Sequence, residues 1–210
     1  MTATLKAAKN AVRRQMKSVI GALTTEEKLR QSQIVTNMQL LQRPEYKRSR
    51  RVAAYVSKAD EVGTEQLIRG IIESGRACFI PRYWERESRM EMLRLRSVEE
   101  LSALPSTAWG ISQPSGDDAE SRENALLTGG LDLIVVPGRA FTADGGRLGR
   151  GGGYYDVYLG RLRPEAGYSG PQPFTVGLAF RQQVLPHLPL DKADVPLHLV
   201  LCPPPEAGNT

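Results

Sequence analysis

Apolar and polar positions follow two different periods along the chain, and the change between them predicts the order of its elements. Through residue 42 the apolar residues recur at roughly helical spacing, and Thr24 followed by Glu27 is the pattern of a capping box at a helix start. After residue 50, short runs of β-branched and apolar residues alternate with helical stretches. We therefore expect N-terminal helices within residues 4–42, packed on an α/β body.

Six apolar runs predict strands, and the most apolar of them lies in the second half of the chain. Residues 131–142 are almost continuously apolar before Pro137 and Gly138, as in a strand that is covered on both faces. The other strands are expected at 50–57, 77–83, 90–95, 173–180 and 197–201, with helices near 64–74 and over 154–162. This alternation predicts an α/β fold, a three-layer α/β/α arrangement with a mostly parallel, Rossmann-like central sheet. Ligands bind such sheets at the carboxyl ends of the strands.

The length of the chain and the distribution of its loops favour one domain over residues 1–210. A chain of 210 residues has the size of an ordinary single domain. Polar stretches at 114–125 and 163–173 are typical of loops, and the proline-rich end, 203–210, is typical of a loose tail. No apolar run approaches the roughly 20 residues of a membrane span, so no membrane partner is expected.

Composition narrows the function classes only slightly. Hydrophobic residues at 40% and charged residues at 24% are ordinary for a globular protein. The net charge of +5 suits anionic ligands, but no nucleic-acid-binding motif is present and aromatic residues make up only 6%, which disfavours a nucleic-acid partner. Cys78 and Cys202 lie far apart without a metal-binding spacing, which fits a reducing compartment.

The basic start of the chain raises the question of targeting. Five basic residues precede the first acid, Glu26, as in a mitochondrial presequence. The stretch is poor in serine, however, and its apolar residues follow helical spacing, which favours a structural helix. We expect a cytoplasmic monomer.

The segment RLGRGGGYYD, residues 147–156, carries the most specific chemistry of the chain. Four glycines in ten positions let the backbone adopt positive φ and approach a ligand closely, so that successive amides can point at phosphate oxygens. Arg147 and Arg150 would neutralise the phosphate charge, and the following helix would add its positive N-terminal end. A flexible spacer is the alternative, but paired tyrosines do not suit one. The segment has neither the Gly-Lys-Ser/Thr of a Walker loop nor a dinucleotide fingerprint.

Asp156, at the end of this segment, has two interpretations. Magnesium commonly takes one or two carboxylates together with phosphate oxygens, so Asp156 could hold a divalent cation through water. It could equally stabilise the first turn of its helix, where the helix dipole favours an acid.

Five segments together resemble the 5-formyltetrahydrofolate cyclo-ligase family in its animal form. They are EEKLRQS (26–32), ADE (59–61), CFIPRY (78–83), TGGLDLI (128–134) and RLGRGGGYYD (147–156), in the family's order and spacing. The resemblance implies an enzyme that uses ATP and Mg²⁺ to convert 5-formyltetrahydrofolate into 5,10-methenyltetrahydrofolate, with release of ADP and phosphate. It also implies that the formyl oxygen attacks the γ-phosphate, that the neighbouring anilino nitrogen captures the activated carbon, and that phosphate then leaves.

The resemblance further implies a set of site residues. ATP contacts are expected at Lys9, Arg13, Arg147, Leu148, Gly149, Arg150, Gly151, Gly152, Gly153, Tyr154 and Tyr155. Folate contacts are expected at Val56, Glu61, Trp109, Arg150, Gly151, Gly152, Gly153 and Tyr154, with the loop between the two ligands. Magnesium is expected at Asp156 and Asp194. Arg150 and Tyr155 form the expected catalytic set, with Arg150 at the γ-phosphate charge and Arg147 as its rival.

Elementary chemistry agrees with several of these roles and offers a plainer alternative for each. Lys9 and Arg13 are four residues apart and share one helix face, which would also describe an ordinary solvated basic face. Glu61 can accept hydrogen bonds from pterin N–H groups, or it is a surface charge before the next helix. Trp109 offers a flat apolar wall to the pterin, or it packs within its own loop.

Two positions depart from the family pattern. His198 stands four residues after Asp194, where relatives generally carry another acid, and neutral histidine binds magnesium poorly. Gly152 stands where relatives often have a basic residue, and the run of three glycines predicts a more mobile loop in the absence of ligand.

Three function classes stay open on the sequence. An ATP-dependent ring-closing enzyme leads. A folate or nucleotide binder without catalysis would bind folate without releasing phosphate, and a basic nucleic-acid-binding module would bind a polyanion with steep salt dependence.

Overall fold

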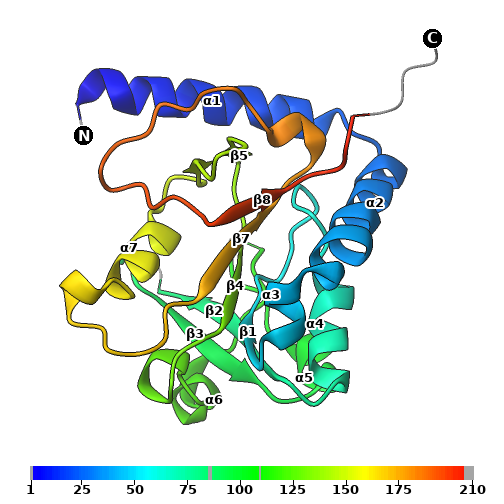
Figure 1. Ribbon diagram of the computed structural model, residues 1–210, viewed down its shortest axis with the longest axis vertical. Helices are drawn as coiled ribbons and strands as arrows, with labels where there is room; N and C mark the ends of the chain where they lie inside the picture. Colours follow the sequence, from blue (N-terminus) through cyan, green and yellow to red (C-terminus); the bar gives the residue numbers. More distant parts are fainter. Residues whose placement is uncertain (1, 85–86, 109, 206–210) are drawn as a thin grey trace.

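The computed structural model describes residues 2–84, 87–108 and 110–205, and Figure 1 shows their arrangement. The helices are α1 (Ala3–Gly21), α2 (Thr25–Gln33), α3 (Pro44–Arg48), α4 (Glu65–Glu73), α5 (Val98–Ala103), α6 (Gly116–Ser121) and α7 (Tyr154–Arg161). The strands are β1 (Arg51–Ala53), β2 (Ala77–Tyr83), β3 (Met90–Leu95), β4 (Leu133–Val136), β5 (Ala140–Phe141), β6 (Arg147–Leu148), β7 (Phe174–Leu178) and β8 (Leu199–Leu201). Within these ranges no helix combines the length and the apolar character needed to cross a bilayer.

Six of these strands form one sheet, and its order explains where a ligand can enter. Across the described residues the order is β3-β2-β1-β4-β7-β8, parallel except for the antiparallel pair β2 and β3. After β1 the chain adds β2 and then β3 toward one edge of the sheet. After β4 it adds β7 and then β8 toward the other edge. The carboxyl ends of β1 and β4 therefore flank a topological switch point, the place where open α/β sheets bind ligands.

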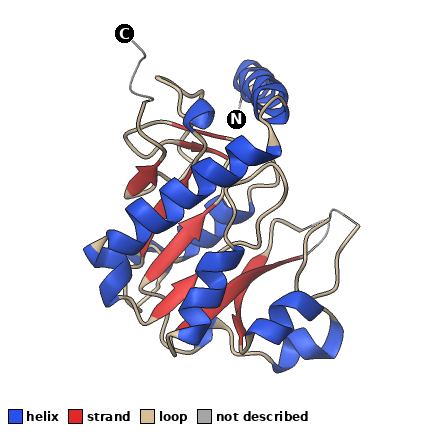
Figure 2. Ribbon diagram, turned by 90° about the vertical axis from the view of Figure 1, so that its right-hand side faces the viewer, coloured by secondary structure: helices blue, strands red, loops and turns tan. Residues whose placement is uncertain are grey.

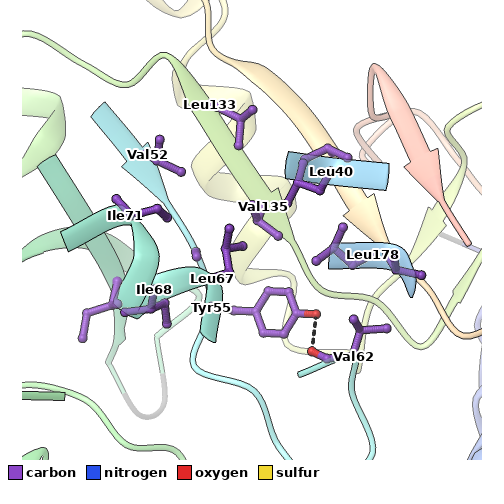
Figure 3. Packing of buried hydrophobic residues seen from close by; sticks show 14 of the residues in the cluster. Leu40, Val52, Tyr55, Val62, Leu67, Ile68, Ile71, Leu133, Val135 and Leu178 are labelled. Carbon is purple, nitrogen blue, oxygen red and sulfur yellow. Dashed lines mark hydrogen bonds between the residues drawn. The ribbon is translucent and has the colours of Figure 1, made fainter. Parts of the chain in front are cut away.

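Helices cover both faces of the sheet, with α4 and α7 on opposite sides (Figure 1). One buried cluster joins Val52 and Val135 of the sheet to Leu67 of α4 (Figure 3), and Figure 2 shows the helices of this side in front of the strands. A second cluster joins Met92 of β3 to Tyr158 of α7. Parallel strands need such cover on both faces, and the predicted three-layer, mostly parallel, Rossmann-like fold is confirmed.

The N-terminal helices lie largely as predicted, and α1 crosses the end of the sheet at which β4 and β7 finish (Figure 1). Ile20 of α1 is fully buried in the first cluster. Thr24 caps α2, because its Oγ1 accepts a hydrogen bond from the backbone N–H of Glu27 at 3.1 Å. The Glu27 side chain does not close the capping box, since it accepts hydrogen bonds from Arg30 instead.

The prediction of a single long strand at 131–142 is wrong, and the actual arrangement determines where the glycine segment lies. The strand breaks at Pro137 and Gly138, so that β4 ends at residue 136 and β5 pairs antiparallel with β6 outside the main sheet. The Phe141 ring packs so closely on Gly138 that a Cβ there would collide with it. The β5–β6 hairpin therefore carries the start of the glycine segment beyond the carboxyl edge of the sheet.

Other element boundaries also differ from the sequence expectations. The strand predicted at 50–57 ends at Ala53, and residues 54–64 form the loop to α4. The stretch 114–125, predicted as a loop, contains α6, and α3 and α5 were not predicted. Beyond α2 the chain continues as a π-helical stretch (Ile34–Gln39) and a 3-10 turn (Leu40–Gln42).

Gly145 allows a close approach between the β5–β6 hairpin and the segment before β8, which generates a prediction. Its φ is +100°, its carbonyl oxygen accepts a hydrogen bond from the Leu197 N–H at 2.9 Å, and a Cβ would collide with the Leu197 carbonyl. We expect Gly145→Ala to lower the free energy of unfolding, measured in urea, by about 2 kcal/mol or more. The matched control is Gly70→Ala in α4, where a Cβ meets open space and should stabilise by about 1 kcal/mol. Equal effects of the two substitutions would contradict the prediction.

Candidate active site

The glycine segment forms a turn between β6 and α7, and residues 149–153 are called the glycine loop below. Its φ is +114° at Gly151 and +71° at Gly153, where α7 begins. The Leu148 side chain is fully buried, so this residue can offer a ligand only its backbone, whose carbonyl already accepts the Arg139 N–H at 2.7 Å. The loop therefore presents mainly backbone groups, together with the side chain of Arg150.

A cavity of about 250 Å³ lies on one side of the glycine loop, and we call it the switch-point cavity. Residues that follow β1, including Val56 and Glu61, meet residues that follow β4, including Gly138, in its wall. Tyr154 and Tyr155 of α7 also line it. The cavity lies at the carboxyl ends of β1 and β4, where the fold predicts a ligand.

A second cavity, of about 300 Å³, lies on the other side of the loop beneath α1, and we call it the α1 cavity. Lys9 and Arg13 of α1 and Asp194 line it. Three residues, Gly149, Gly153 and Asp156, belong to the walls of both cavities. The glycine loop is thus a boundary between two candidate ligand sites.

Lys9 is buried, with 3% of its surface exposed, so the alternative of a solvated basic face is wrong for this residue. Its Nζ lies 2.5 Å from Asp194 Oδ2 and 3.5 Å from Asp191 Oδ2. Asp194 Oδ2 also accepts the Asp191 N–H at 2.6 Å. The ion pair fastens α1 to the segment that precedes β8.

Arg13 lies one turn further along α1 and contacts the loop itself. Its Nε donates to the Gly149 carbonyl oxygen at 2.9 Å, and its Nη1 donates to Asn10 Oδ1 at 2.8 Å. Burial lowers the pKa of Arg13, and the charges of Asp194 and Asp156 partly oppose that shift. The predicted pair Lys9 and Arg13 is therefore brought to one cavity by α1.

Arg147 is buried beneath the loop beside Asp156. Its Nη2 lies 2.7 Å from Asp156 Oδ1, and its guanidinium lies over the Tyr155 ring, 5.7 Å from the centroid. Its buried Nε has no hydrogen-bond acceptor among the described residues. Asp156 stands in the first turn of α7, as one interpretation predicted, and also lines both cavities.

Arg150 lies on the switch-point side of the boundary. Its Nε donates to Glu61 Oε1 at 2.9 Å, its Nη1 donates to Asp60 Oδ2 at 3.1 Å, and its Nη2 also donates to Asp60. The structure thus brings Arg150 together with the predicted folate residue Glu61. It does not bring Arg150 into the wall of the α1 cavity, where Lys9 and Arg13 lie.

Asp60 is a site residue that the sequence reasoning missed. Its Oδ2 also accepts a hydrogen bond from Arg139 Nη1 at 2.8 Å. Burial disfavours the charged carboxylate, but the hydrogen bonds and charges of Arg150 and Arg139 outweigh it and hold the pKa of Asp60 well below its ordinary value. The available signal was the pair of adjacent acids in ADE, of which only Glu61 was assigned a role.

Tyrosines form much of the switch-point cavity. The rings of Tyr83 and Tyr154 meet edge to face with centroids 5.0 Å apart. Burial raises the pKa of both Tyr83 and Tyr155 well above the ordinary value. Both phenols are therefore neutral at physiological pH and can donate a hydrogen bond.

The connection between β2 and β3 also touches the glycine loop. The Ser88 hydroxyl donates to the Gly152 carbonyl oxygen at 3.0 Å, and the Tyr154 hydroxyl donates to the Trp84 carbonyl oxygen at 3.2 Å. A Cβ at Gly152 would collide with the Tyr154 ring. Glycine at this position therefore fits the local packing of the chain.

The sequence also singles out Trp109 and His198. Trp109 lies outside the described residues. His198, the departure from the family pattern, lines neither cavity, because its Nδ1 accepts the Thr175 N–H at 3.1 Å and its ring stacks on Phe174 with centroids 5.1 Å apart.

The two predicted magnesium residues, Asp156 and Asp194, share the wall of the α1 cavity. Each directs one oxygen at a basic side chain and a backbone N–H. The other oxygen of each has no hydrogen-bond donor within the part of the chain that the structure describes. In that part, no three His, Cys, Asp or Glu side chains are grouped to hold a metal by themselves.

Comparisons with a family model and with curated proteins point to one enzyme family. The model of the 5-formyltetrahydrofolate cyclo-ligase family matches residues 5–203. The chain is 44% identical to the mouse 5-formyltetrahydrofolate cyclo-ligase, over 94% of this chain and 95% of that protein. It is 33% identical to a probable 5-formyltetrahydrofolate cyclo-ligase of Caenorhabditis elegans, over 94% of this chain and 93% of that protein.

Solved structures give the same result. The NMR structure of the 5,10-methenyltetrahydrofolate synthetase of Aquifex aeolicus superimposes with a TM-score of 0.70 and 30% identity, covering 92% of this chain and 88% of that one. A synthetase of the same name from Mycoplasma pneumoniae shares the fold, with a TM-score of 0.67 and 21% identity over 92% of this chain and 98% of that one. From these matches, which span nearly its whole length, the chain belongs to the 5-formyltetrahydrofolate cyclo-ligase family of enzymes.

Proposed function

We propose that this chain converts 5-formyltetrahydrofolate into 5,10-methenyltetrahydrofolate, using ATP and Mg²⁺ and releasing ADP and phosphate. One observation carries the proposal: the glycine loop is a wall common to two cavities of different character. The switch-point cavity is lined largely by aromatic and apolar side chains, together with Glu61 and the basic residues Lys58, Arg147 and Arg150. The α1 cavity is lined by loop glycines and by charged side chains of both signs, with Lys9 and Arg13 facing three aspartates. A phosphoryl transfer between a nucleotide and a folate needs its two substrates to meet at one boundary, and the loop offers that boundary.

The α1 cavity is the proposed nucleotide side. Lys9 and Arg13 bring positive charge to it from α1, and the start of α7, whose helix dipole favours an anion, lines the same cavity. Arg147 lines the switch-point cavity instead, and its buried Nε, which has no acceptor among the described residues, adds a cation on the other side of the loop. These groups suit the β- and γ-phosphates of ATP.

The switch-point cavity is the proposed folate side. Glu61 offers a carboxylate to pterin N–H groups, and Val56 contributes apolar wall. The neutral hydroxyls of Tyr83 and Tyr155 suit polar oxygens of the substrate. Residues of the glycine loop lie between this ligand and the nucleotide.

Magnesium fits the donor set of the α1 cavity. Asp156 and Asp194 each have an oxygen that no described hydrogen bond uses, and magnesium takes one or two carboxylates with phosphate oxygens and water. When bound there, the ion supplies positive charge that stabilises the transferring phosphate.

The proposed chemistry has two steps. The formyl oxygen attacks the γ-phosphorus as the bond to ADP breaks. The anilino nitrogen then attacks the activated carbon and releases its proton to solvent, and the carbon–oxygen bond breaks as phosphate leaves. Positioning and charge neutralisation dominate phosphoryl transfer. In this proposal Arg150 and Arg147 stabilise charge at the boundary, Lys9 and Arg13 orient the nucleotide, and Tyr155 orients the folate.

The direct test mixes the purified protein with 5-formyltetrahydrofolate, ATP and Mg²⁺ and follows methenyltetrahydrofolate absorbance together with phosphate release. We expect both signals to rise in equal amounts and only when ATP is present. Folate binding without either signal would favour the non-catalytic binder instead. The monomeric state and the cytoplasmic location stay predictions from the sequence.

Arg150→Ala should reduce kcat about 100-fold or more, because it removes a cation from the site where charge develops. Its side chain is about a third exposed, so the free energy of unfolding should change by less than about 1 kcal/mol. Steady-state kinetics and urea unfolding measure the two effects. Arg163→Ala, at an exposed position outside both cavities, is the control, and an Arg150→Ala variant that matches it in kcat would rule out the catalytic assignment.

Asp156→Asn should raise the Mg²⁺ concentration needed for half-maximal turnover about tenfold or more, because it weakens a carboxylate ligand. The amide keeps an acceptor for the Val195 N–H, which Asp156 Oδ1 binds at 3.1 Å. A magnesium titration at saturating substrates measures the effect, with Asp117→Asn on exposed α6 as control. An unchanged titration would leave Asp156 only its place in the first turn of α7.

A further inference from the structure

Asp60 and Glu61 are adjacent in the chain, but they make different contacts beside the glycine loop. We propose that Asp60 is the positioning residue of Arg150, holding its guanidinium at the edge of the glycine loop so that Glu61 stays available to the substrate. The inference rests on the function proposed above and deepens it.

Arg150 needs a partner outside its own loop. It stands between Gly149 and Gly151, whose backbone freedom gives the side chain little direction. The printed sequence offers no bulky neighbour that could pack against its stem within the loop. The direction of the Arg150 side chain therefore depends on the acids of the loop that follows β1. Asp60 accepts hydrogen bonds from two of the Arg150 guanidinium nitrogens.

Asp60 is itself well held. Arg139 Nη1 donates to Asp60 Oδ2 at 2.8 Å, and the Arg139 carbonyl oxygen accepts from the buried side chain of Gln183 at 3.2 Å. On the other side, the hydroxyl of buried Tyr55 donates to the Val62 carbonyl oxygen at 2.9 Å and closes the loop that carries Asp60 (Figure 3). A carboxylate that is bound by Arg139 and carried on a closed loop can fix a guanidinium in place.

Glu61 is placed differently. It lines the switch-point cavity, whereas Asp60 does not. Its Oε2 accepts the Lys58 N–H at 3.0 Å, and its Oε1 accepts Arg150 Nε at 2.9 Å and also lies 2.9 Å from Arg150 Nη2. A ligand with N–H donors in the cavity therefore competes with Arg150 for Glu61 but not for Asp60. Because both oxygens of Asp60 bind the guanidinium, Arg150 keeps its place when the substrate occupies Glu61.

The ion pair between Asp60 and Arg150 orients the Arg150 side chain but adds little to the stability of the fold. The Arg150 and Asp60 side chains are 35% and 33% exposed, so water screens their attraction. The two-point contact still sets the orientation of the guanidinium plane. Loss of Asp60 should therefore affect the chemical step more than folding.

The kinetic test compares Asp60→Asn, Asp60→Glu and Glu61→Gln, with Glu65→Gln, at an exposed acid of α4, as the matched acid-to-amide control. We expect Asp60→Asn to lower kcat about tenfold or more, because a misplaced catalytic group costs at least that much, with the KM for 5-formyltetrahydrofolate changed less than about threefold. Glu61→Gln should instead raise that KM about tenfold. Asp60→Glu should restore most of the kcat. An Asp60→Asn variant that equals the control, or that repeats the Glu61→Gln pattern, would overturn the inference.

A second measurement needs no turnover. Trypsin must capture the arginine side chain to cut the Arg150–Gly151 bond, so an arginine held by Asp60 is a poor substrate. We expect Asp60→Asn to speed cleavage at this bond about tenfold relative to other bonds in the same digest, and Asp60→Glu to return it toward the unsubstituted chain. Equal cleavage in all variants contradicts the inference, whereas an unsubstituted chain that releases no phosphate contradicts only the proposed function. If Asp60→Asn does not fold, Arg139→Gln, which removes the cation that holds Asp60, replaces it in both measurements and should change them in the same direction.

Discussion

A buried ion pair joins the two ends of the chain, and the proposed nucleotide side of the site depends on it. Lys9 and Asp194 are 185 residues apart in sequence and 2.5 Å apart at their charged atoms. Removing both charges from water costs several kcal/mol per ion, which their attraction and the hydrogen bond from the Asp191 N–H offset. Such a pair adds little net stability, but it fixes where α1 lies. Because α1 also carries Arg13, the same contact decides which helix face meets the glycine loop.

The glycine loop gains its position from other elements rather than from its own residues. Arg13 holds the Gly149 carbonyl, Ser88 holds the Gly152 carbonyl, and Asp60 holds Arg150. These partners come from three distant parts of the chain. Hydrogen bonds of this kind exchange with a ligand more readily than packed apolar contacts do, so a loop held this way can adjust to two substrates without disturbing the core.

The sequence predicted what depends on local pattern and missed what depends on distant partners. The strands at 77–83 and 90–95 and the loop before α7 agree with the structure, because periodicity and glycine spacing are local signals. The break after β4 is an exception, because Pro137 and Gly138 were a local signal for it that the prediction of one strand over 131–142 did not use. Burial of Lys9 was not visible, since a basic helix face has the same spacing whether it meets water or an acid. The pairing of Asp60 with Arg150 joins residues 90 apart.

An acid beside a catalytic arginine has a physical purpose in the proposed reaction. An arginine without an anionic partner would bind the phosphates of ATP and ADP with its full charge, in the ground state as strongly as in the transition state, and such uniform binding does not raise kcat. With Asp60 sharing the guanidinium, the pull on a resting phosphate is reduced, while in the proposed reaction Arg150 remains beside the loop at which new charge develops. Arg139 keeps Asp60 ionised and in place during the transfer. In the proposed reaction the acid pair after β1 serves both substrates, with Glu61 at the folate and Asp60 holding the cation assigned to the phosphate.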